Sequence, residues 1–289
     1  MKNLILYLIY RIFTLLVLIF PTSLKKSLGR GFGKLAYKIT PGRRQIAAEN
    51  IKRALPAKSQ KEIDKMVKAV YDNLGKVMVE FILLKKLDKN NLKNLVEIEG
   101  ENHLKRAANS EEGVIIYSAH FGNWEWLASI LALKGYKLSA IAQEQSNKLF
   151  NKKVNQIRKE KGIEIIPKGV SVRNVYKKLK DGECVFILGD QNAGKKGWKM
   201  QFFNLDTSAY NGAVKLAQKT GARIVPAFIA RKGWLNFKIT IHPSLQVNKS
   251  ADNKKLKGIL QELLSITENT IKENPEQWFW LHRRWKTYH

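Results

Sequence analysis

The sequence has a single cysteine and no arrangement of residues typical of a metal centre. Cys184 has no partner for an internal disulfide and lies in the apolar run CVFIL. We therefore expect it to be a buried strand residue in a reducing compartment and not a nucleophile. None of the five histidines is spaced with another histidine or a cysteine as metal ligands are. The sequence thus indicates no metal site.

Acidic residues are scarce: 24 Asp and Glu stand against 52 Lys and Arg, a formal net charge of +28. This charge exceeds what solubility requires and favours an acidic partner, such as membrane phosphates, nucleic acid or an acidic carrier protein. The basic residues are spread along the whole chain, and no common nucleic-acid-binding motif occurs, so we expect no nucleic-acid partner. The 289 residues contain no repeat or low-complexity linker, which fits one sizeable domain with an N-terminal attachment.

One long apolar run lies near the N-terminus, at residues 4–20, and only Arg11 and Thr14 interrupt it. As a helix it would reach about 26 Å against a bilayer core of ~30 Å, so a tilted span and an interfacial helix both fit. A cleaved signal peptide is disfavoured, because Arg11 breaks the apolar region and no A-x-A site follows. Residues 1–22 are therefore predicted to be a membrane anchor helix. Basic residues after Pro21 predict a cytoplasmic main body by the positive-inside rule.

Residues 23–90 have a helical pattern of apolar residues. The sequence SQKE has the form of a capping box, with Ser59 as the N-cap and Glu62 as the carboxylate that returns to it. We expect an all-helical N-terminal region that lies against the membrane or the core.

Residues 91–289 are predicted to form an α/β core, because short β-like runs alternate there with helical windows. This alternation predicts a mainly parallel central sheet flanked by helices on both faces. The expected strands are VEIEG, GVIIYSA, KLSAIAQ, IEIIP, CVFILGD, ARIVPAFIA and FKITIH; the expected helices cover 124–134, 147–161, 172–180, 209–220 and 253–273. Ligands bind beyond the carboxyl ends of parallel strands. His120 and Asp190 follow two of these strands, which places them at that edge.

The stretch SAHFGNWEWL, residues 118–127, contains a candidate general base. On one continuous helix His120 and Glu125 would point about 140° apart. A working pair therefore requires His120 in a turn and Glu125 in the first turn of the following helix. The carboxylate could then orient the imidazole, and Asn123 with the first helix amides could donate to an oxyanion. Spacing alone also fits a core histidine packed beside two tryptophans.

Six short motifs are spread in order over nearly the whole chain: GRRQIAAENIKRALP, HFGNWE, NQIRKEKG, GDQN, LAQKTGARIVPAFIAR and PEQWFWLHRRWK. HFGNWE resembles the HX4D/E signature of glycerolipid-type acyltransferases. The ordered set resembles more closely the late acyltransferases of lipid A biosynthesis, the lauroyl/myristoyl transferase family of Gram-negative bacteria. The resemblance implies a glycerolipid acyltransferase-like fold, with His120 as the base and Glu125 as its partner.

The resemblance also implies residues that bind substrate, and each has a plainer interpretation. The implied residues, together with Asn123, are Arg158, Asp190, Gln191, Arg283 and Arg284. From the residues alone, Arg158 could merely flank a buried helix face, and Asp190 could cap a loop. HRRWK could be an ordinary solvated tail.

The reaction implied by the resemblance is an acyl-ACP-dependent O-acylation at the cytoplasmic side of a bacterial inner membrane, with a single N-terminal anchor. Acyl carrier protein would donate the fatty acyl group, and an anionic glycolipid, a lipid A precursor, would accept it. A thioester is already activated, so we expect no cofactor. Two alternatives stay open. One is a related membrane acyltransferase for another glycolipid, a lysophospholipid or glycerol phosphate, and the other is a basic, non-catalytic binding protein.

Two stretches depart from patterns that they nearly match. GDQNAGKK, residues 189–196, approaches the P-loop pattern, but Lys196 replaces the magnesium-binding hydroxyl and Asp190 would place negative charge in the phosphate cradle. We therefore expect no nucleotide site. In QFFNLDTSAY, Asn204 stands where the resembled family more often has glycine, which leaves acyl-chain or acceptor specificity open.

Overall fold

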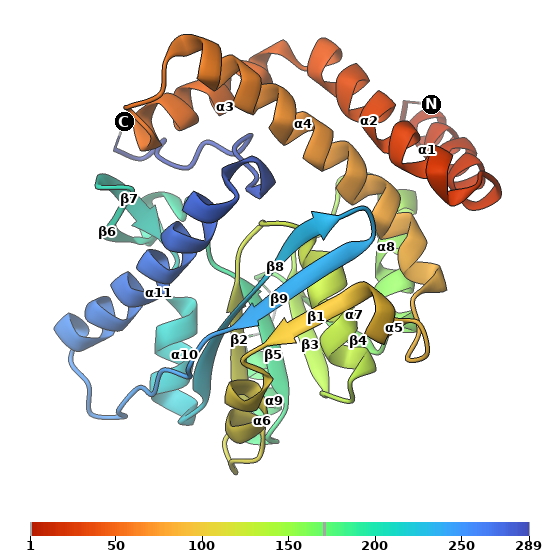
Figure 1. Cartoon of the computed structure of the whole chain (residues 1–289). Helices are drawn as coiled ribbons and strands as arrows, with labels where there is room; N and C mark the ends of the chain where they lie inside the picture. Colours follow the sequence, from red (N-terminus) through yellow and green to blue (C-terminus); the bar gives the residue numbers. More distant parts are fainter. Residues whose placement is uncertain (1, 170–171, 289) are drawn as a thin grey trace.

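A seven-stranded, mainly parallel sheet organises the chain (Figure 1), and its strand order is β1-β9-β8-β2-β5-β3-β4. The strands are β1 (Val96–Glu99), β2 (Val114–Ser118), β3 (Leu138–Ala142), β4 (Ile163–Pro167), β5 (Cys184–Leu188), β8 (Arg223–Gly233) and β9 (Asn236–Ile241). Within this sheet only β8 and β9 pair antiparallel. The computed structural model describes residues 2–169 and 172–288; Met1, Val170, Ser171 and His289 lie outside the described residues. The predicted mainly parallel sheet is confirmed.

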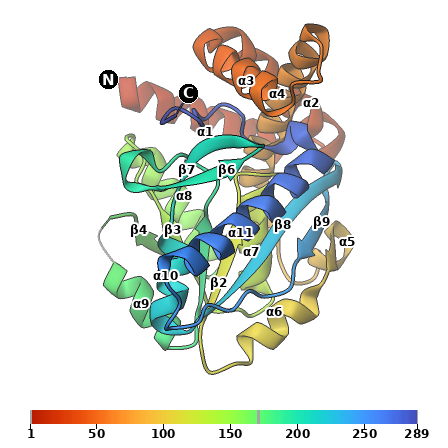
Figure 2. The same cartoon turned by 90° about the vertical axis from the view of Figure 1, so that its left-hand side faces the viewer.

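Helices cover both faces of this sheet because its central strands are apolar on both sides. In β2, Ile115 and Tyr117 point into one apolar cluster, and Val114 and Ile116 into the other. The first cluster is closed by α9 (Val172–Lys180), α10 (Gly212–Thr220) and α11 (Asn253–Glu273), which lie in front in Figure 2. The second is closed by α6 (Glu101–Ala108), α7 (Trp124–Leu133) and α8 (Lys148–Glu160). Cys184 is a buried residue of β5, as predicted, and burial raises the pKa of its thiol to about 12.

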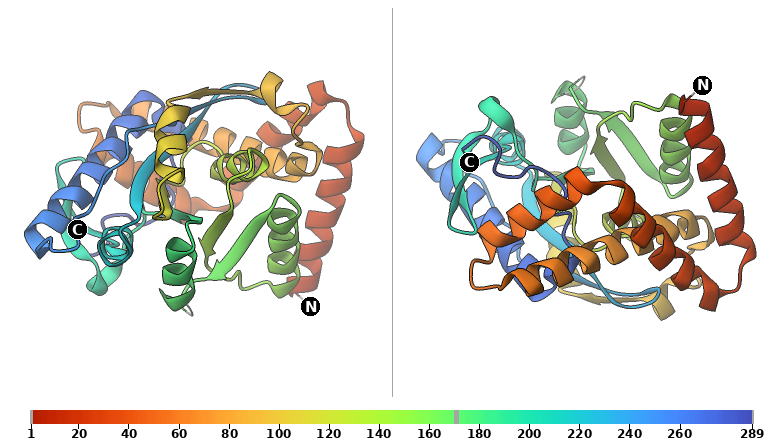
Figure 3. Two further views of the ribbon diagram at one scale, coloured as in Figure 1. Left: turned by 90° about the horizontal axis from the view of Figure 1, so that it is seen from below. Right: turned by 90° about the horizontal axis from the view of Figure 1, so that it is seen from above.

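The N-terminal helices form a layer across the carboxyl end of the sheet (Figures 1 and 3). They are α1 (Lys2–Ile19), α2 (Thr22–Ile39), α3 (Pro41–Ala54) and α4 (Gln60–Leu83), followed by η1 (Leu84–Lys86) and α5 (Leu92–Leu95). The predicted capping box opens α4: Ser59 accepts a hydrogen bond from the amide of Glu62, whose carboxylate accepts one from the amide of Ser59. Glycine lets α2 and α4 approach closely, because a Cβ at Gly75 would lie 2.0 Å from the carbonyl oxygen of Gly29.

The prediction of an N-terminal membrane anchor is wrong. Among the residues that the structure describes, no helix is both long enough and apolar enough to cross a membrane. One side of α1 packs on protein instead: Thr14 and Val17 are buried, and the ring of Tyr10 meets Phe150 of α8 edge-on with the centroids 5.1 Å apart. Arg11 also interrupts the apolar run. The inner-membrane location that depended on this single anchor is withdrawn with it.

A small antiparallel hairpin that the sequence did not predict lies beside the main sheet. It consists of β6 (Trp198–Phe202) and β7 (Leu205–Ala209), and η2 (Gly194–Lys196) precedes it. The two-residue loop between the strands has positive φ at Phe203 (55°) and Asn204 (57°), as a type I′ turn requires. Asparagine tolerates this conformation better than most residues. The departure at Asn204 thus meets a backbone requirement that glycine also meets.

Substitutions at Asn204 should follow this backbone requirement. Asn204→Gly should leave the free energy of unfolding nearly unchanged, whereas Asn204→Ala should lower it by about 1 kcal/mol, because a Cβ without a local hydrogen-bonding group strains the left-handed conformation. Urea unfolding of both variants measures the difference. An alanine variant as stable as the glycine variant would show that the turn does not have this geometry.

Candidate active site

Two adjacent strands bring His120 and Asp190 together at the carboxyl edge of the sheet. In the register of β2 and β5, Ser118 lies opposite Leu188. His120 follows Ser118 by two positions, and Asp190 follows Leu188 by two positions. The His120 amide donates to Asp190 Oδ2 at 3.0 Å, and its Nδ1 lies 2.8 Å from Oδ1. The indole Nε1–H of Trp278 also donates to Oδ2, at 2.8 Å. Asp190 therefore fixes both the backbone and the ring of His120.

The electrostatics of this contact determine which nitrogen of His120 carries the proton. Burial alone would raise the pKa of Asp190, but His120 and the hydrogen bonds from His120 and Trp278 outweigh it and lower the pKa to about 2. An ionised carboxylate only accepts hydrogen bonds, so Nδ1 must be the protonated nitrogen. The lone pair of the neutral imidazole is then on Nε2. The side-chain amide nitrogen of Gln191 lies 3.5 Å from this Nε2.

Glu125 occupies its predicted position but has a different partner from the one predicted. As the spacing demanded, His120 lies in a bend, and α7 begins at Trp124, which puts Glu125 in the first helical turn. Its carboxylate accepts from Arg158 of α8, however, at 2.6 Å from Nη2 and 3.0 Å from Nε. The carboxylate that contacts His120 is that of Asp190. The expected His120–Glu125 contact is therefore corrected to two separate pairs.

His120 and the Glu125–Arg158 pair border one cavity of about 660 Å³. The His120 ring packs edge-on against Trp124 with the centroids 5.0 Å apart, and it lies 6.3 Å from the ring of Phe279. The polar lining includes Gln191 and the Glu125–Arg158 pair, and the apolar lining includes Ile141, Ile187, Leu188, Ala213 and Leu216. A partly exposed histidine thus lies at a cavity that is apolar on one side and large enough for an extended hydrocarbon chain.

The other predicted site residues lie outside this cavity. Asn123 is fully buried; its side chain accepts from the amide of Trp126, which caps α7, and donates to Glu80 at 2.8 Å. Arg284 is also buried, and it donates to the carbonyl oxygens of Gln191 and Ser208 at 3.2 and 2.7 Å. Arg283 is exposed and lines a neighbouring cleft. Their predicted contacts with substrate stay predictions.

The turn that carries His120 is held by a segment near the C-terminus. The backbone amide of Gly122 donates to the carbonyl oxygen of Gln277 at 2.9 Å. The backbone amide of Phe279 donates to the carbonyl oxygen of His120 at 3.0 Å. Gly122 has φ +57°, and a Cβ there would lie 1.7 Å from the carbonyl oxygen of Ile229. Only glycine therefore fits this position without a backbone shift.

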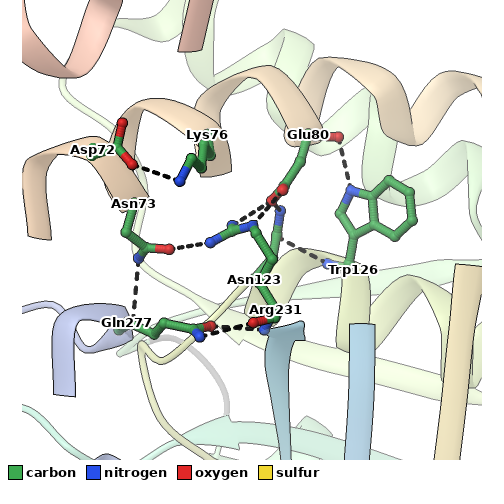
Figure 4. A network of polar contacts seen from close by, with 8 residues as sticks. All are labelled: Asp72, Asn73, Lys76, Glu80, Asn123, Trp126, Arg231 and Gln277. Carbon is green, nitrogen blue, oxygen red and sulfur yellow. Dashed lines mark hydrogen bonds and ion pairs between the residues drawn. The ribbon is translucent and has the colours of Figure 1, made fainter. Parts of the chain in front are cut away.

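A buried polar network that sequence reasoning missed braces the same turn (Figure 4). The guanidinium of Arg231 in β8 donates to both carboxylate oxygens of Glu80 in α4: Nε to Oε1 and Nη2 to Oε2, each at 2.6 Å. The side-chain amide of Asn123 also donates to this carboxylate, and the indole of Trp126 donates to the backbone carbonyl of Glu80 at 2.8 Å. Gln277 exchanges two hydrogen bonds with the backbone of Arg231. A charged residue within the apolar run VMVEFILL was the available signal.

The described residues form neither a metal centre nor a P-loop. No three His, Cys, Asp or Glu side chains within residues 2–169 and 172–288 are grouped as metal ligands. The loop at 189–196 leads through η2 into strand β6. A P-loop requires a helix there, so the departure noted in its sequence extends to its structure.

With this geometry in place, comparison with known families decides the class of protein. The sequence model of the bacterial lipid A biosynthesis acyltransferases matches residues 1–287. The chain belongs to this family. The resemblance carried by the six motifs is thereby confirmed, and the protein is an acyltransferase of lipid A biosynthesis.

Two relatives by sequence are named as acyltransferases, at modest identity. The lipid A biosynthesis palmitoleoyltransferase of Escherichia coli K12 is 27% identical over 263 residues, which cover 90% of this chain and 84% of that protein. A phosphatidylinositol mannoside acyltransferase of Mycobacterium tuberculosis H37Rv is 22% identical over 245 residues, 82% of this chain and 75% of that protein. The crystal structure of PlsC, a 1-acyl-sn-glycerophosphate acyltransferase from Thermotoga maritima, covers 89% of this chain and 99% of its own, with TM-score 0.44 and 14% identity. The two relatives by sequence differ in the lipid for which they are named.

Removing the charge of Glu80 should destabilise the protein strongly. Glu80→Gln leaves the Arg231 guanidinium buried without a counter-charge, and we expect the free energy of unfolding to fall by about 3 kcal/mol. Chemical denaturation gives this value. The exposed pair Lys238–Glu99 provides the matched control, since Glu99→Gln should have little effect. Equal losses in the two variants would contradict the bracing role of the network.

Because the pKa of Asp190 is lowered in the folded protein, the free energy of unfolding should fall in acid. Because this pKa is lower in the folded protein than in the unfolded chain, its stabilisation is complete above about pH 4 and is lost as the pH falls towards 2. Between pH 5 and 3 the wild type should lose roughly 1 kcal/mol more than Asp190→Asn, which has no group to titrate. Urea unfolding at each pH measures both. Parallel losses would show that the carboxyl has an ordinary pKa.

Proposed function

We propose that the protein is an acyl-ACP-dependent O-acyltransferase that moves a fatty acyl group from acyl carrier protein to a hydroxyl of a lipid A precursor. The observation that carries this proposal is the orientation of His120. Asp190 holds its Nδ1 at 2.8 Å, which leaves the basic Nε2 facing a cavity whose lining is partly apolar. A base beside a hydrocarbon-sized cavity suits the transfer of an acyl chain to a hydroxyl.

In the proposed reaction, His120 Nε2 removes the proton from the acceptor hydroxyl, and the oxygen attacks the thioester carbonyl carbon. The resulting tetrahedral intermediate collapses when the carbon–sulfur bond breaks, and the imidazolium returns its proton to the thiolate. Asp190 stabilises the imidazolium through Nδ1 without itself accepting a proton, because its pKa is about 2. The ester forms with no need for ATP, a metal or another cofactor.

The surrounding residues take supporting roles in this proposal. Gln191 lines the cavity 3.5 Å from the histidine and can donate to the developing oxyanion. The Glu125–Arg158 pair joins α7 to α8 and forms part of the polar wall of the cavity. Glu125 thus shapes the cavity beside His120 and does not contact the imidazole. We assign Asn123 and Arg284 to positioning, because both are buried and hold the turn and loop of the site.

The proposed substrates fit the charge of the chain. An acyl carrier protein is acidic and a lipid A precursor is anionic, so a net charge of +28 favours both encounters. The Escherichia coli relative, named for lipid A biosynthesis, supports the choice of acceptor. The mycobacterial relative supports a second candidate, transfer to another glycolipid. Lysophospholipid and glycerol phosphate remain acceptors that a direct assay has to test.

His120→Ala should reduce acyl transfer by at least about 10³-fold while the protein stays folded, because the general base is lost. Transfer from acyl carrier protein to a lipid A precursor, followed by mass spectrometry of the product, measures the rate. His103→Ala, on α6, is the matched control and should retain the wild-type rate. Near wild-type transfer by His120→Ala would exclude this mechanism. Acylation of glycerol phosphate alone would exclude the proposed acceptor.

A further inference from the structure

A second concavity of about 1170 Å³, which we call the basic cleft, lies beside the catalytic cavity. It is formed where the start of α3, the loop that ends in η2, and the C-terminal HRRWK segment meet. Four cations line it, from three separate parts of the chain: Arg43, Lys195, Arg283 and Lys286. The cleft therefore exists only because the fold brings these distant segments together.

No carboxylate balances the charge of the basic cleft. None of its lining residues is an aspartate or a glutamate. Within the described ranges 2–169 and 172–288, none of the four cations forms an ion pair, and all four are exposed. Elsewhere on the surface, lysines such as Lys199 and Lys238 do have carboxylate partners. Four unpaired cations around one concavity create a strong local attraction for an anion.

His282 adds a neutral donor to the basic cleft. Its Nε2 accepts from the amide of Asn192 at 3.1 Å, so its proton must be on Nδ1. Burial lowers the pKa of this imidazole to about 4, although Asp190 opposes the shift, and the ring is therefore uncharged at neutral pH. Arg43 donates to the carbonyl of Leu281 at 3.1 Å and retains other N–H groups for a ligand. Guanidinium and ammonium groups with a neutral donor are the groups that recognise phosphate.

The basic cleft and the catalytic cavity are lined by neighbouring residues of the chain. Gln191 lines the cavity, and the next residue, Asn192, lines the cleft. Tyr210 borders both spaces, and its hydroxyl accepts from Lys168 at 3.1 Å. A molecule with its anionic group in the cleft can therefore extend past Tyr210 into the cavity that contains His120. The apolar side of the cavity, at Ile187 and Leu216, is left for the acyl chain of the donor.

We propose that the basic cleft binds a phosphate monoester group on the acceptor and thereby presents the acceptor hydroxyl to His120. This inference rests on the proposed function and adds a recognition site to it. A monoester carries nearly two negative charges at neutral pH, and four unpaired cations match it better than they match the single charge of a diester. The phosphodiester that links a thiol to acyl carrier protein is the other source of phosphate, and the experiment separates the two.

The test combines cleft variants with acceptors that differ only in phosphate. Lys195→Ala/Lys286→Ala should raise the KM for a phosphorylated lipid A precursor by about tenfold or more, with kcat within about twofold of wild type. With the same precursor after phosphatase treatment, wild type and variant should have equal and high KM values. The KM for acyl carrier protein thioester should not change.

Lys196→Ala/Lys257→Ala is the matched control, since it removes the same charge from exposed lysines outside the cleft. Arg43→Ala serves as a second probe from another element. A rise in the KM for the thioester donor alone would reassign the cleft to the donor. Cleft variants that match the control, or a dephosphorylated acceptor that reacts as well as the phosphorylated one, would refute the site. If the wild-type protein transferred an acyl group to none of these acceptors, the proposed function itself would be refuted.

Discussion

The hydrogen bonds between His120 and Asp190 join the ends of two neighbouring parallel strands, and the catalytic geometry depends on them. The carboxylate accepts from the backbone and the ring of the histidine and from Trp278, and it is almost completely buried. A buried charge persists only when such partners satisfy it. The same contacts that make this burial tolerable also fix the tautomer of the imidazole, so stability and chemical function arise here from one interaction.

The surroundings of this contact are arranged to keep it in place. Gly122 allows the turn to pass close to β8, Gln277 and Phe279 hold the turn from the C-terminal side, and the Glu80–Arg231 pair braces it from α4. These groups come from the two ends of the chain and from its middle. The N-terminal helices thus contribute to the site even though no helix among the described residues can span a membrane.

Much of the core could be predicted from the sequence, because its signals are local. Alternating strand and helix patterns identified the seven strands of the main sheet, and the turn at His120 with the helix at Glu125 followed from spacing. The pairing of His120 was missed because Asp190 is distant in sequence and only the β2–β5 register brings it close. Glu125 was the nearer carboxylate. The β6–β7 hairpin was missed because Phe203 is not a typical turn residue, and its left-handed conformation is supported by packing near Trp278 and Trp280.

The central claim is that Asp190 holds His120 with its proton on Nδ1 and its basic lone pair on Nε2. Long-range ¹⁵N–¹H correlation spectra of protein with ¹⁵N-labelled histidine report this tautomer directly, at a pH where the imidazole is neutral. The account predicts the Nδ1–H form in the wild type and its loss in Asp190→Asn. An Nε2–H form in the wild type would contradict it, because that nitrogen could not then accept the proton of an acceptor hydroxyl.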